Sequence, residues 1–285
     1  MSLSAIVILY NPNKTIIENI NSYINEIEGL YIIDNSEQKD AELLNQIKGL
    51  SPKCQLLINP GNYGIAKALN QAVEFASRDG YEWLLTMDQD SIFYDDSYFK
   101  AFKENNGKDD VAIFIPQIIF NKSEIEPDKE IVCKAYNDAI MTSGSILNIK
   151  TCLSLGGFET KLFIDEVDTD YYYKVLRQKS KIVIIEGTYL IHALGKERII
   201  HLPFHKTIRI FEHQPFRHYY ITRNYLYLVN QHFRALPNLV VERGRKVFLV
   251  KLMHGVLFHP QRFAVIGYTF KGFFDFVFNR YGILK

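Results

Sequence analysis

Short apolar runs alternate with helix-periodic stretches through the first hundred residues of the chain. Aliphatic and β-branched runs predict four strands, over residues 4–10, 31–34, 54–59 and 82–87. Between them, residues 13–28 and 64–78 carry apolar residues at helical spacing. This alternation is typical of parallel strands joined by crossover helices. The pattern therefore predicts an α/β fold with a mostly parallel, Rossmann-like central sheet flanked by helices.

Polar, turn-forming residues follow each of the predicted strands. Asn-Pro follows the first, Asp-Asn-Ser the second and Asn-Pro-Gly-Asn the third, while the fourth runs into Asp-Gln-Asp at residues 88–90. Ligands of open α/β sheets bind outside the carboxyl ends of the strands. We therefore expect these loops to meet at one edge of the sheet and to form a site.

The alternation loosens after residue 90. Residues 111–120 predict a strand, 121–137 a polar loop and 138–149 another strand, so a mixed sheet is expected there. From about residue 206 the chain becomes basic, aromatic and helical. Its apolar positions Phe263, Ile266, Phe270, Phe273 and Val277 are spaced by three and four residues. Two parts are predicted: a catalytic domain over 1–205 and a helical C-terminal extension over 206–285.

Charge is distributed unevenly along a chain that is long enough for a sizeable core. The 285 residues are 47% hydrophobic and carry a net charge of +1. The C-terminal region from Lys206 has 13 Lys and Arg but 3 Asp and Glu, a net charge of +10, which leaves −9 for residues 1–205. On charge alone, the basic region suits a phosphorylated substrate, an anionic membrane or nucleic acid.

Cysteine usage and the N-terminus indicate the compartment. Cys54, Cys133 and Cys152 are widely spaced, odd in number and form no CxxC pair, which favours a reducing compartment. The N-terminal apolar run lacks a basic segment before it, and no stretch offers about 18 uninterrupted apolar residues. A cytoplasmic location is expected, with a peripheral position on the inner face of the plasma membrane as the alternative.

The paired aspartates at the end of the fourth strand are the first candidates for chemistry. In an extended segment, positions i and i+2 point to the same side, so Asp88 and Asp90 are expected to share one pocket while Gln89 points away. Hard cations such as Mg²⁺ and Mn²⁺ prefer carboxylate oxygens and share their shell with phosphates. The alternative is a helix cap or a solvated turn, because Asp-x-Asp is short and common.

An ordered series of motifs gives the pair its context. It comprises VILYNPN, IIDNS, NYGIAKALNQA, TMDQDS, TSGSILN, GGFETKLFIDEVDTDYYYKVLR, HALG and YYITRN. Together, over residues 4 to about 230, they resemble glycosyltransferase family two, and within it the bacterial rhamnosyltransferases. The resemblance implies a GT-A fold and inverting, metal-dependent sugar transfer. It further implies a nucleotide-sugar donor, with dTDP-rhamnose the first choice and a UDP-sugar the second, and a saccharide or lipid-linked acceptor in cell-surface polysaccharide synthesis.

The resemblance also assigns nucleotide contacts. It implies them at Tyr10, Asn11, Asp34, Asn62, Gly64 and Lys67. Asp34 matches the acidic residue that contacts the nucleoside, and the alternative is a turn or capping aspartate. Gly64 would permit close backbone approach to the nucleotide. Lys67 would reach a phosphate, with a solvated helix lysine as the alternative.

Metal and acceptor chemistry are assigned in the same way. The resemblance implies that Asp90 ligates Mg²⁺ or Mn²⁺ directly, with Asp88 nearer the ribose or a metal-bound water. Asp168 holds the position of the base that removes the acceptor proton. The alternative is an ordinary acidic helix N-terminus favoured by the macrodipole, because residues 165–170 carry four carboxylates. Val167 departs from the commonest pattern, in which Glu stands there.

Two further residues are candidates for the diphosphate side of the site. His192, after the predicted strand 181–191, would complete the metal shell or contact the diphosphate; a structural histidine is the alternative. Arg223 would bind the diphosphate bidentately. Its neighbours Tyr219 and Tyr220 would pack the helix onto the catalytic domain.

Residues 245–285 mix aromatic residues with spaced Lys and Arg, which favours either an anionic bilayer interface or a homodimer or core interface. The family resemblance implies no nucleic-acid partner.

Two other functions stay open. A sugar nucleotidyltransferase would share the fold, but YNPNKT is poor in the glycines and cations of a phosphate loop. A non-catalytic sugar-nucleotide binder would keep Asp34 and Asp90 without needing Asp168.

Overall fold

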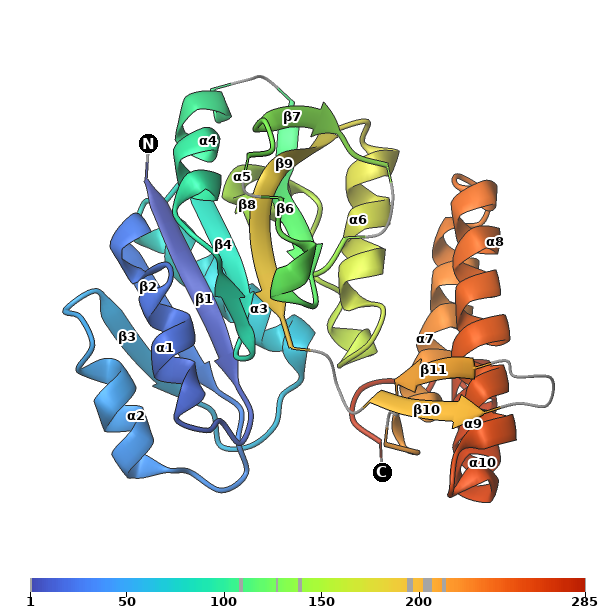
Figure 1. The fold of residues 1–285 in the computed structure, drawn as a ribbon. Helices are drawn as coiled ribbons and strands as arrows, with labels where there is room; N and C mark the ends of the chain where they lie inside the picture. The colour runs from blue at the N-terminus through green and yellow to red at the C-terminus, as the bar shows by residue number, and fades with distance from the viewer. Residues whose placement is uncertain are drawn as a thin grey trace. The chain divides into compact units, whose positions relative to one another are not determined.

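The computed structural model describes residues 2–107, 110–126, 128–137, 140–193, 197–201, 207–211 and 214–284. The chain divides into two compact units (Figure 1). The first consists of Met1–Glu159 and Lys174–Ala193, and the second of Thr160–Tyr173 and Leu194–Lys285. The boundary predicted between residues 205 and 206 lies outside the described residues, so the division into 1–205 and 206–285 stays a prediction.

A nine-stranded sheet forms the centre of the first unit. Its strands are β1 (Leu3–Leu9), β2 (Gly29–Asp34), β3 (Cys54–Ile58), β4 (Trp83–Asp88), β5 (Ser91–Phe93), β6 (Val111–Ile119), β7 (Val132–Ala135), β8 (Ser145–Asn148) and β9 (Lys181–His192). They follow the order β3-β2-β1-β4-β8-β6-β9-β5, with β7 beside β9. The β1–β4 strands pair in parallel, as do β6 and β9, whereas β8 is antiparallel to both neighbours. The α/β prediction is confirmed.

Helices flank this sheet, which explains the composition of its inner strands (Figure 1). They are α1 (Thr15–Asn21), α2 (Ala41–Lys48), α3 (Ile65–Arg78), α4 (Ser97–Asn105) and α5 (Ile149–Ser154). Strand β2 is buried at every position and β1 at all but one, as expected for parallel strands covered on both faces. The Trp83 ring packs 5.3 Å from Phe102 and 5.6 Å from Phe114, measured between centroids, and so joins β4 to α4 and β6.

Several predicted elements differ from the observed ones. The helix predicted over 13–28 ends at Asn21 and is followed by a 3₁₀ turn at Ile24–Glu26, and α2 is an additional helix. The loop predicted over 121–137 contains β7, a half-exposed strand that is defined by its pairing with β9. The strand predicted over 138–149 is confined to β8, because Gly144 turns the chain with a φ of +81° and α5 starts at Ile149; residues 138–139 lie outside the described part.

The second unit is mainly helical but starts with a hairpin. Strands β10 (Glu197–His201) and β11 (Thr207–Phe211) pair antiparallel, so the prediction of helix from about residue 206 was wrong there. The helices are α7 (Arg217–His232), α8 (Pro237–Arg245), the π-helical η4 (Lys246–Leu252), α9 (Met253–Phe258) and α10 (Arg262–Val277), and α6 (Val167–Arg177) begins in this unit.

Helices α7 and α10 pack closely. A Cβ atom on Gly272 would come within 2.5 Å of the Tyr219 carbonyl oxygen, so this approach requires glycine. Most of α7 is buried, including Tyr219, Tyr220 and Arg223. Within the described part of the chain, no helix is long and apolar enough to cross a membrane.

Candidate active site

Asp88, Asp90 and His192 converge at the end of the fourth strand. Asp88 is the last residue of β4, and a two-residue turn leads into β5. Strand β5 pairs antiparallel with β9 and sets Ser91 opposite His192. As a result, potential ligand atoms of the three residues all lie within 4.8 Å of one another. His192 is the last residue of its strand, and its Nδ1 lies 3.7 Å from an Asp90 carboxylate oxygen.

The turn between the two aspartates is held by Gln89. Its Oε1 accepts a hydrogen bond from the Tyr10 N–H at 2.9 Å, and its Nε2 donates to the Tyr10 carbonyl at 3.2 Å. Asn19 donates to the Gln89 carbonyl at 2.8 Å. The amide side chain is therefore turned toward the exit of β1, while the carboxylates on either side of it come together.

The donor set fits a divalent cation. The two carboxylates supply the oxygen ligands that Mn²⁺ and Mg²⁺ prefer, and His192 adds an imidazole nitrogen, a ligand more typical of transition metals than of Mg²⁺. His192 Nδ1 is 2.8 Å from Ser91 Oγ; when it donates to that hydroxyl, Nε2 is the nitrogen left for coordination. The Asp90 side chain is 51% exposed, so the set is open to solvent and to a ligand. Three protein ligands leave the remaining positions of an octahedral shell for phosphate oxygens or water.

The exits of the neighbouring strands lie at the same edge. Leu9 pairs with Asp34, Ile8 with Asp88, and Asp34 with Ile58, so β1 to β4 end in register. The loops at residues 10–11, 34–36 and 59–64 therefore leave from the edge that carries the Asp88 pair. Strand-end reasoning gave the same edge.

Asp34 is buried in a cluster at the end of β2. Its Oδ1 accepts hydrogen bonds from the Ser36 N–H at 3.0 Å and from the Ser36 hydroxyl at 2.5 Å. Its Oδ2 lies 3.1 Å from Lys39 Nζ, outside hydrogen-bond geometry, and has no hydrogen-bond partner within the described residues. This buried oxygen is therefore paired with the Lys39 ammonium group but accepts no hydrogen bond.

The segment after β3 is tied to the same cluster. Asn35 Nδ2 donates to the Gly64 carbonyl at 3.1 Å, and the Gly64 N–H donates to Asn62 Oδ1 at 2.9 Å. Gly64 has a φ of +80°, a conformation that suits glycine, and it precedes the first residue of α3. Lys67, in the first turn of α3, is exposed, and its Nζ lies 3.8 Å from the centre of the Tyr63 ring.

Tyr10 and Asn11 follow β1 and are exposed at this edge of the sheet. The Tyr10 side chain is 44% exposed although its backbone is fixed by Gln89. Asn11 has a φ of +48°, and its N–H donates to Ser36 Oγ at 2.8 Å. An exposed aromatic ring next to a buried carboxylate acceptor is a surface suited to a planar base.

Asp168 belongs to the second unit, in an acidic segment at the start of α6. Three of the four carboxylates in this segment have basic partners. Arg217 binds Asp165 at 2.6 and 3.1 Å, Arg243 binds Glu166 at 2.6 and 2.7 Å, and His232 Nε2 lies 2.8 Å from Asp170.

Asp168 alone among the four has no ion-pair partner within the described residues; its oxygen accepts from the Thr169 N–H at 2.8 Å. Desolvation raises the pKa of its half-buried carboxyl, and the nearby Arg243 offsets part of that rise. A carboxylate with a raised pKa and no ion pair is available as a base, whereas the side chains of its three neighbours are each bound to a basic residue.

The backbone before Asp168 is held in an unusual shape. Phe163, Asp165 and Glu166 all have φ values between 60° and 65°, in the left-handed region. Asn224 Nδ2 donates to three carbonyls of this loop, those of Leu162, Ile164 and Asp165, at 2.7–2.9 Å. Such a conformation persists only where its surroundings fix it. The Asn224 amide supplies that support.

Arg223 also supports this loop. The sequence predicted that it would contact the diphosphate, but its guanidinium is bound inside the protein. Its guanidinium is fully buried and donates to the carbonyls of Lys161, Leu162 and Gly282, to the Tyr219 hydroxyl and to Asn224 Oδ1. No exposed N–H is left for a diphosphate. We therefore assign Arg223 to the loop before Asp168, and its neighbour Tyr219 packs on α10 through Asp275.

Sequence reasoning missed Arg217, Asn224, His232 and Arg243. Their partners lie 52 to 77 residues away along the chain, so no local spacing reveals them. For Asn224 the motif YYITRN was the available signal, because it pointed to this helix.

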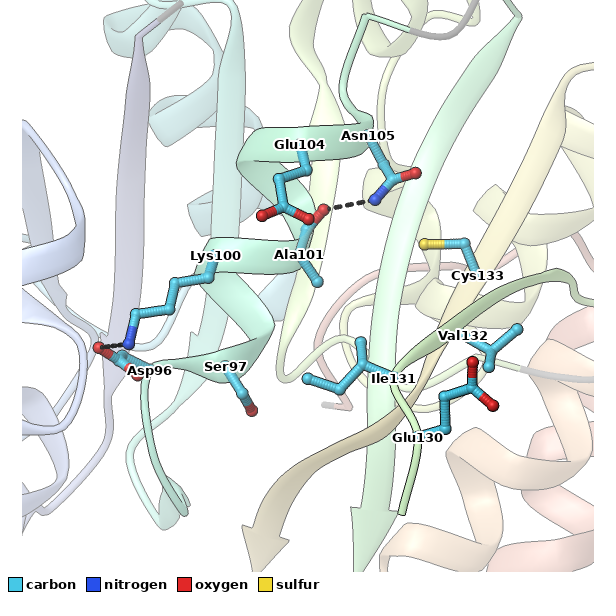
Figure 2. Close-up of a pocket in the computed structure, with 10 residues that line it drawn as sticks. All are labelled: Asp96, Ser97, Lys100, Ala101, Glu104, Asn105, Glu130, Ile131, Val132 and Cys133. Atoms are coloured by element: carbon cyan, nitrogen blue, oxygen red, sulfur yellow. Dashed lines mark hydrogen bonds and ion pairs between the residues drawn. The ribbon is translucent and has the colours of Figure 1, made fainter. Parts of the chain in front are cut away.

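A pocket of about 580 Å³ lies elsewhere in the first unit, between α4 and the segment leading into β7 (Figure 2). Lys100 forms an ion pair with Asp96 at 2.7 Å on its rim, and Glu104, Ile131 and Cys133 line it. It shares no residue with the Asp88 cluster. Its acidic lining makes it a poor site for a nucleotide diphosphate.

Comparison with known families fits the strand-edge site. The model of the family described as Glycosyl transferase family 2 matches residues 4–154, which are more than half of the chain and include every strand exit described above except that of β9. The chain belongs to glycosyl transferase family 2. A curated relative of this family 2 chain, dTDP-rhamnosyl transferase RfbF of Shigella flexneri, is 24% identical over 253 residues, 81% of this chain and 80% of the relative. The resemblance to rhamnosyltransferases is confirmed.

Solved structures show the fold of this family 2 glycosyltransferase. The mannosyltransferase PcManGT from Pyrobaculum calidifontis, in complex with GDP-Man and Mn²⁺, has a TM-score of 0.62 at 12% identity and covers 98% of this chain and 87% of its own. S. aureus TarS 1–349 with UDP-GlcNAc has a TM-score of 0.61 at 14% identity and covers 97% and 81%. GalNAc-T7 with UDP, GalNAc and Mn²⁺ scores 0.56 at 14% identity; the match covers 68% of this chain but 44% of that longer one. The GT-A fold is confirmed.

Proposed function

We propose that this glycosyltransferase is inverting and metal-dependent, and that it moves L-rhamnose from dTDP-rhamnose to a saccharide or lipid-linked saccharide in cell-surface polysaccharide synthesis. The observation that carries the proposal is the convergence of Asp88, Asp90 and His192 at the strand edge of a family 2 chain. The location proposed is cytoplasmic, where nucleotide sugars are made.

The three converging residues would hold Mg²⁺ or Mn²⁺. Two of the structural relatives contain Mn²⁺ together with a nucleotide or nucleotide sugar. The bound cation supplies neutralisation of charge on the departing diphosphate. Asp90 would be a direct ligand because its carboxylate is the most exposed of the set, while Asp88, fixed by the bond from its N–H to Ser143 Oγ at 3.1 Å, would lie nearer the ribose.

Asp34, Tyr10 and Asn11 would bind the nucleoside. Asp34 Oδ2, which is paired with Lys39 but accepts no hydrogen bond within the described residues, would accept from the N3–H group that thymine and uracil share, and the Tyr10 ring would lie against the base. Asn62, Gly64 and Lys67 would lie beneath the nucleotide, with Lys67 leaving Tyr63 to reach a phosphate. Because the N3–H group is common to both bases, this contact accounts for a pyrimidine nucleotide and leaves a UDP-sugar as the alternative donor.

Asp168 would act as the base. Its carboxylate would take the proton of the acceptor hydroxyl while that oxygen forms a bond to the anomeric carbon on the face opposite the diphosphate. The bond from the anomeric carbon to the diphosphate oxygen breaks, and its electron pair leaves with the diphosphate. The contacts of Asp165 with Arg217, Glu166 with Arg243 and Asp170 with His232 keep the neighbouring carboxylates from competing for this role.

Rhamnose as the transferred sugar is supported by the relative from Shigella flexneri, whose name is dTDP-rhamnosyl transferase. This similarity, at 24% identity, makes dTDP-rhamnose the first donor to test. The test is a transfer assay that compares dTDP-rhamnose with UDP-glucose, UDP-GlcNAc and GDP-mannose in the presence of Mn²⁺ or Mg²⁺, with release of the nucleoside diphosphate as the readout.

We expect release from dTDP-rhamnose to be fastest and to stop when the cation is chelated. The Asp168→Asn variant should lose turnover, whereas Asp128→Asn, at an exposed position, should keep it. Faster release of UDP from a UDP-sugar would show that the protein is a glycosyltransferase whose donor is that sugar nucleotide and not dTDP-rhamnose. Equal rates for wild type and Asp168→Asn would eliminate Asp168 as the base.

A further inference from the structure

Helix α10 in the second unit turns its apolar side outward. The exposed positions Phe263, Phe270, Phe273, Phe274 and Val277 are 78%, 60%, 46%, 52% and 52% accessible. At 100° per residue they occupy one side of the helix. The buried positions of α10, Val265, Gly272 and Asp275, lie on the other side. In an ordinary surface helix the apolar stripe faces the core, so this arrangement is reversed.

The inner side of the helix carries its one acidic residue. Asp275 accepts a hydrogen bond from the Tyr219 hydroxyl at 2.9 Å and lies 3.3 Å from Lys271 Nζ and 3.7 Å from Arg280 Nη1. Its charge is therefore matched within the protein. The outer side presents no carboxylate of the helix to solvent.

Cations frame the apolar face. Arg262 lies at its N-terminal end with the guanidinium 5.4 Å from the Phe263 ring centre, and the Arg280 side chain, just beyond the C-terminal end, is 71% exposed. The preceding helical segments of the same unit add further exposed apolar side chains, namely Phe248, Val250, Met253 and Leu257. An exposed apolar surface of this kind marks an interaction site.

The charge around this apolar face indicates what kind of partner binds it. The chain from Lys206 carries 13 basic and 3 acidic residues. A second copy docked on the same face by two-fold symmetry would bring identical cations together. An anionic bilayer is complementary, because phenylalanine side chains enter the acyl boundary while lysine and arginine stay at the headgroups. The 16 residues of α10 span about 24 Å, less than the hydrocarbon core, so the helix suits a position in the interface plane.

We propose that the outer face of α10 docks this protein on anionic phospholipid membranes. The inference does not depend on the donor or on Asp168. If the acceptor is lipid-linked, docking would bring the enzyme to the surface where that acceptor lies.

Flotation of the full-length protein with phosphatidylcholine vesicles, with and without phosphatidylglycerol, tests this. Wild-type protein should float with the anionic vesicles and stay behind with the neutral ones. The triple variant Phe263→Ser, Phe270→Ser and Phe274→Ser should lose about tenfold or more in the bound fraction at limiting lipid. The matched control Ile58→Ser, Ile131→Ser and Leu153→Ser changes three exposed apolar residues of the first unit and should float like wild type.

A third variant, Arg262→Glu, should weaken flotation, and added salt should do the same. Unchanged flotation of the triple Phe variant would overturn the proposal, as would equal flotation with neutral vesicles. Light scattering that shows a dimer of the wild type and a monomer of the triple variant, without vesicle binding, would assign the face to a second copy instead. Donor-nucleotide binding, measured on the same preparations, separates these outcomes from a failure of the proposed transfer reaction.

Discussion

Four carboxylates within six residues have four different surroundings. Asp165, Glu166 and Asp170 are each held by a basic side chain, whereas Asp168 has a backbone N–H as its partner and a pKa raised by desolvation. The same residue type therefore serves two purposes in one segment. The paired carboxylates fix the backbone, and the fourth is available for proton transfer.

Replacement of Asp168 by Asn should separate catalysis from stability. Turnover should fall by about 10²–10⁴-fold, the usual contribution of a general base. Because folding raises the pKa of this carboxyl, its ionised form is disfavoured in the native state above that pKa, and the cost is relieved as the pH falls through it. The asparagine variant should therefore melt at the wild-type temperature or above it at neutral pH. A loss of thermal stability together with activity would show a structural role instead.

Arg243 should tune the pH dependence of the reaction. Its charge lowers the pKa of Asp168, so Arg243→Met should raise that pKa and move the acidic limb of the rate profile to higher pH. The charge of Glu166 acts in the opposite direction, so the double variant Glu166→Gln, Arg243→Met should move the limb back. Arg245→Met, at an exposed position of the same helix, is the control. A limb that stays in place in the single variant would contradict the assignment.

The same variants report on the buried ion pair. Glu166 is 2% exposed, so removal of Arg243 alone leaves a buried charge and should cost about 3–5 kcal/mol of unfolding free energy. The double variant should recover most of that loss. Chemical denaturation of the three proteins measures both values, and equal losses in the single and double variants would argue against a buried-charge penalty.

At the residue scale, the sequence predicted what is encoded locally. The Asp88 and Asp90 pair follows from one strand end and the two-residue period of an extended chain. The bond from Arg243 to Glu166 joins residues 77 positions apart and has no local signature. Arg223 was misassigned because a motif gives an arginine's position along the chain but does not tell whether its guanidinium faces solvent or five internal acceptors.

Among the elements, the pairing of β5 with β9 brings His192 to the two aspartates of the proposed metal site. Ser91 pairs with His192 across 101 residues, and Phe93 of the same short strand packs into the core. The loop before α6 depends on an element in the same way, because α7 supplies Asn224. In both cases, pairing or packing with an element distant in the sequence fixes the position of a site residue.

Asn224→Ala should weaken the loop before Asp168. The carbonyls of Ile164 and Asp165 lose their donor, while that of Leu162 keeps its bond from Arg223, and each unsatisfied buried group costs about 1–3 kcal/mol. We expect a loss of a few kcal/mol in unfolding free energy and a fall in kcat larger than any change in the affinity for donor nucleotide. Asn45→Ala, on the exposed side of α2, should be neutral. Wild-type kcat in Asn224→Ala would remove the link between this loop and catalysis.

The elements that could be predicted are those buried by their own composition. Strands β1 to β4 and β6 are apolar runs with turn residues at their ends, so they were located to within a residue or two. Strand β7 and the β10–β11 hairpin were missed. Strand β7 is half-exposed and is specified by its partner β9, while the basic and aromatic residues around 206 also suit a helix.

For the whole molecule, the chain passes from the first unit to the second, returns to the first and ends in the second. Residues 160–173 belong to the second unit although the first unit continues from residue 174 to 193. Their partners Arg217, Asn224 and Arg243 all come later in the sequence. The net charge is −9 for residues 1–205 and +10 from residue 206 onward, but this boundary differs from that of the units, because the four carboxylates of residues 165–170 belong to the second unit.

A chain ending at residue 193 should therefore fold poorly. It keeps the sheet but deprives Glu166 and Asp170 of their basic partners and the 161–165 loop of its donors. We expect a lower melting temperature and a lower soluble yield than for the full chain. A truncated protein that melts as cooperatively and at the same temperature would show that the first unit is independent of the second.

The most direct test of the central claim is calorimetric titration of the full chain with dTDP, UDP and GDP, each with and without Mn²⁺, repeated on Asp90→Ala and on the control Asp128→Ala. The account predicts Mn²⁺-dependent binding that prefers dTDP, is lost in Asp90→Ala and is kept in Asp128→Ala. Preference for UDP would change the donor and leave the site in place. Absence of nucleotide binding, or binding that neither Mn²⁺ nor Asp90→Ala affects, would contradict the assignment of the Asp88, Asp90 and His192 cluster.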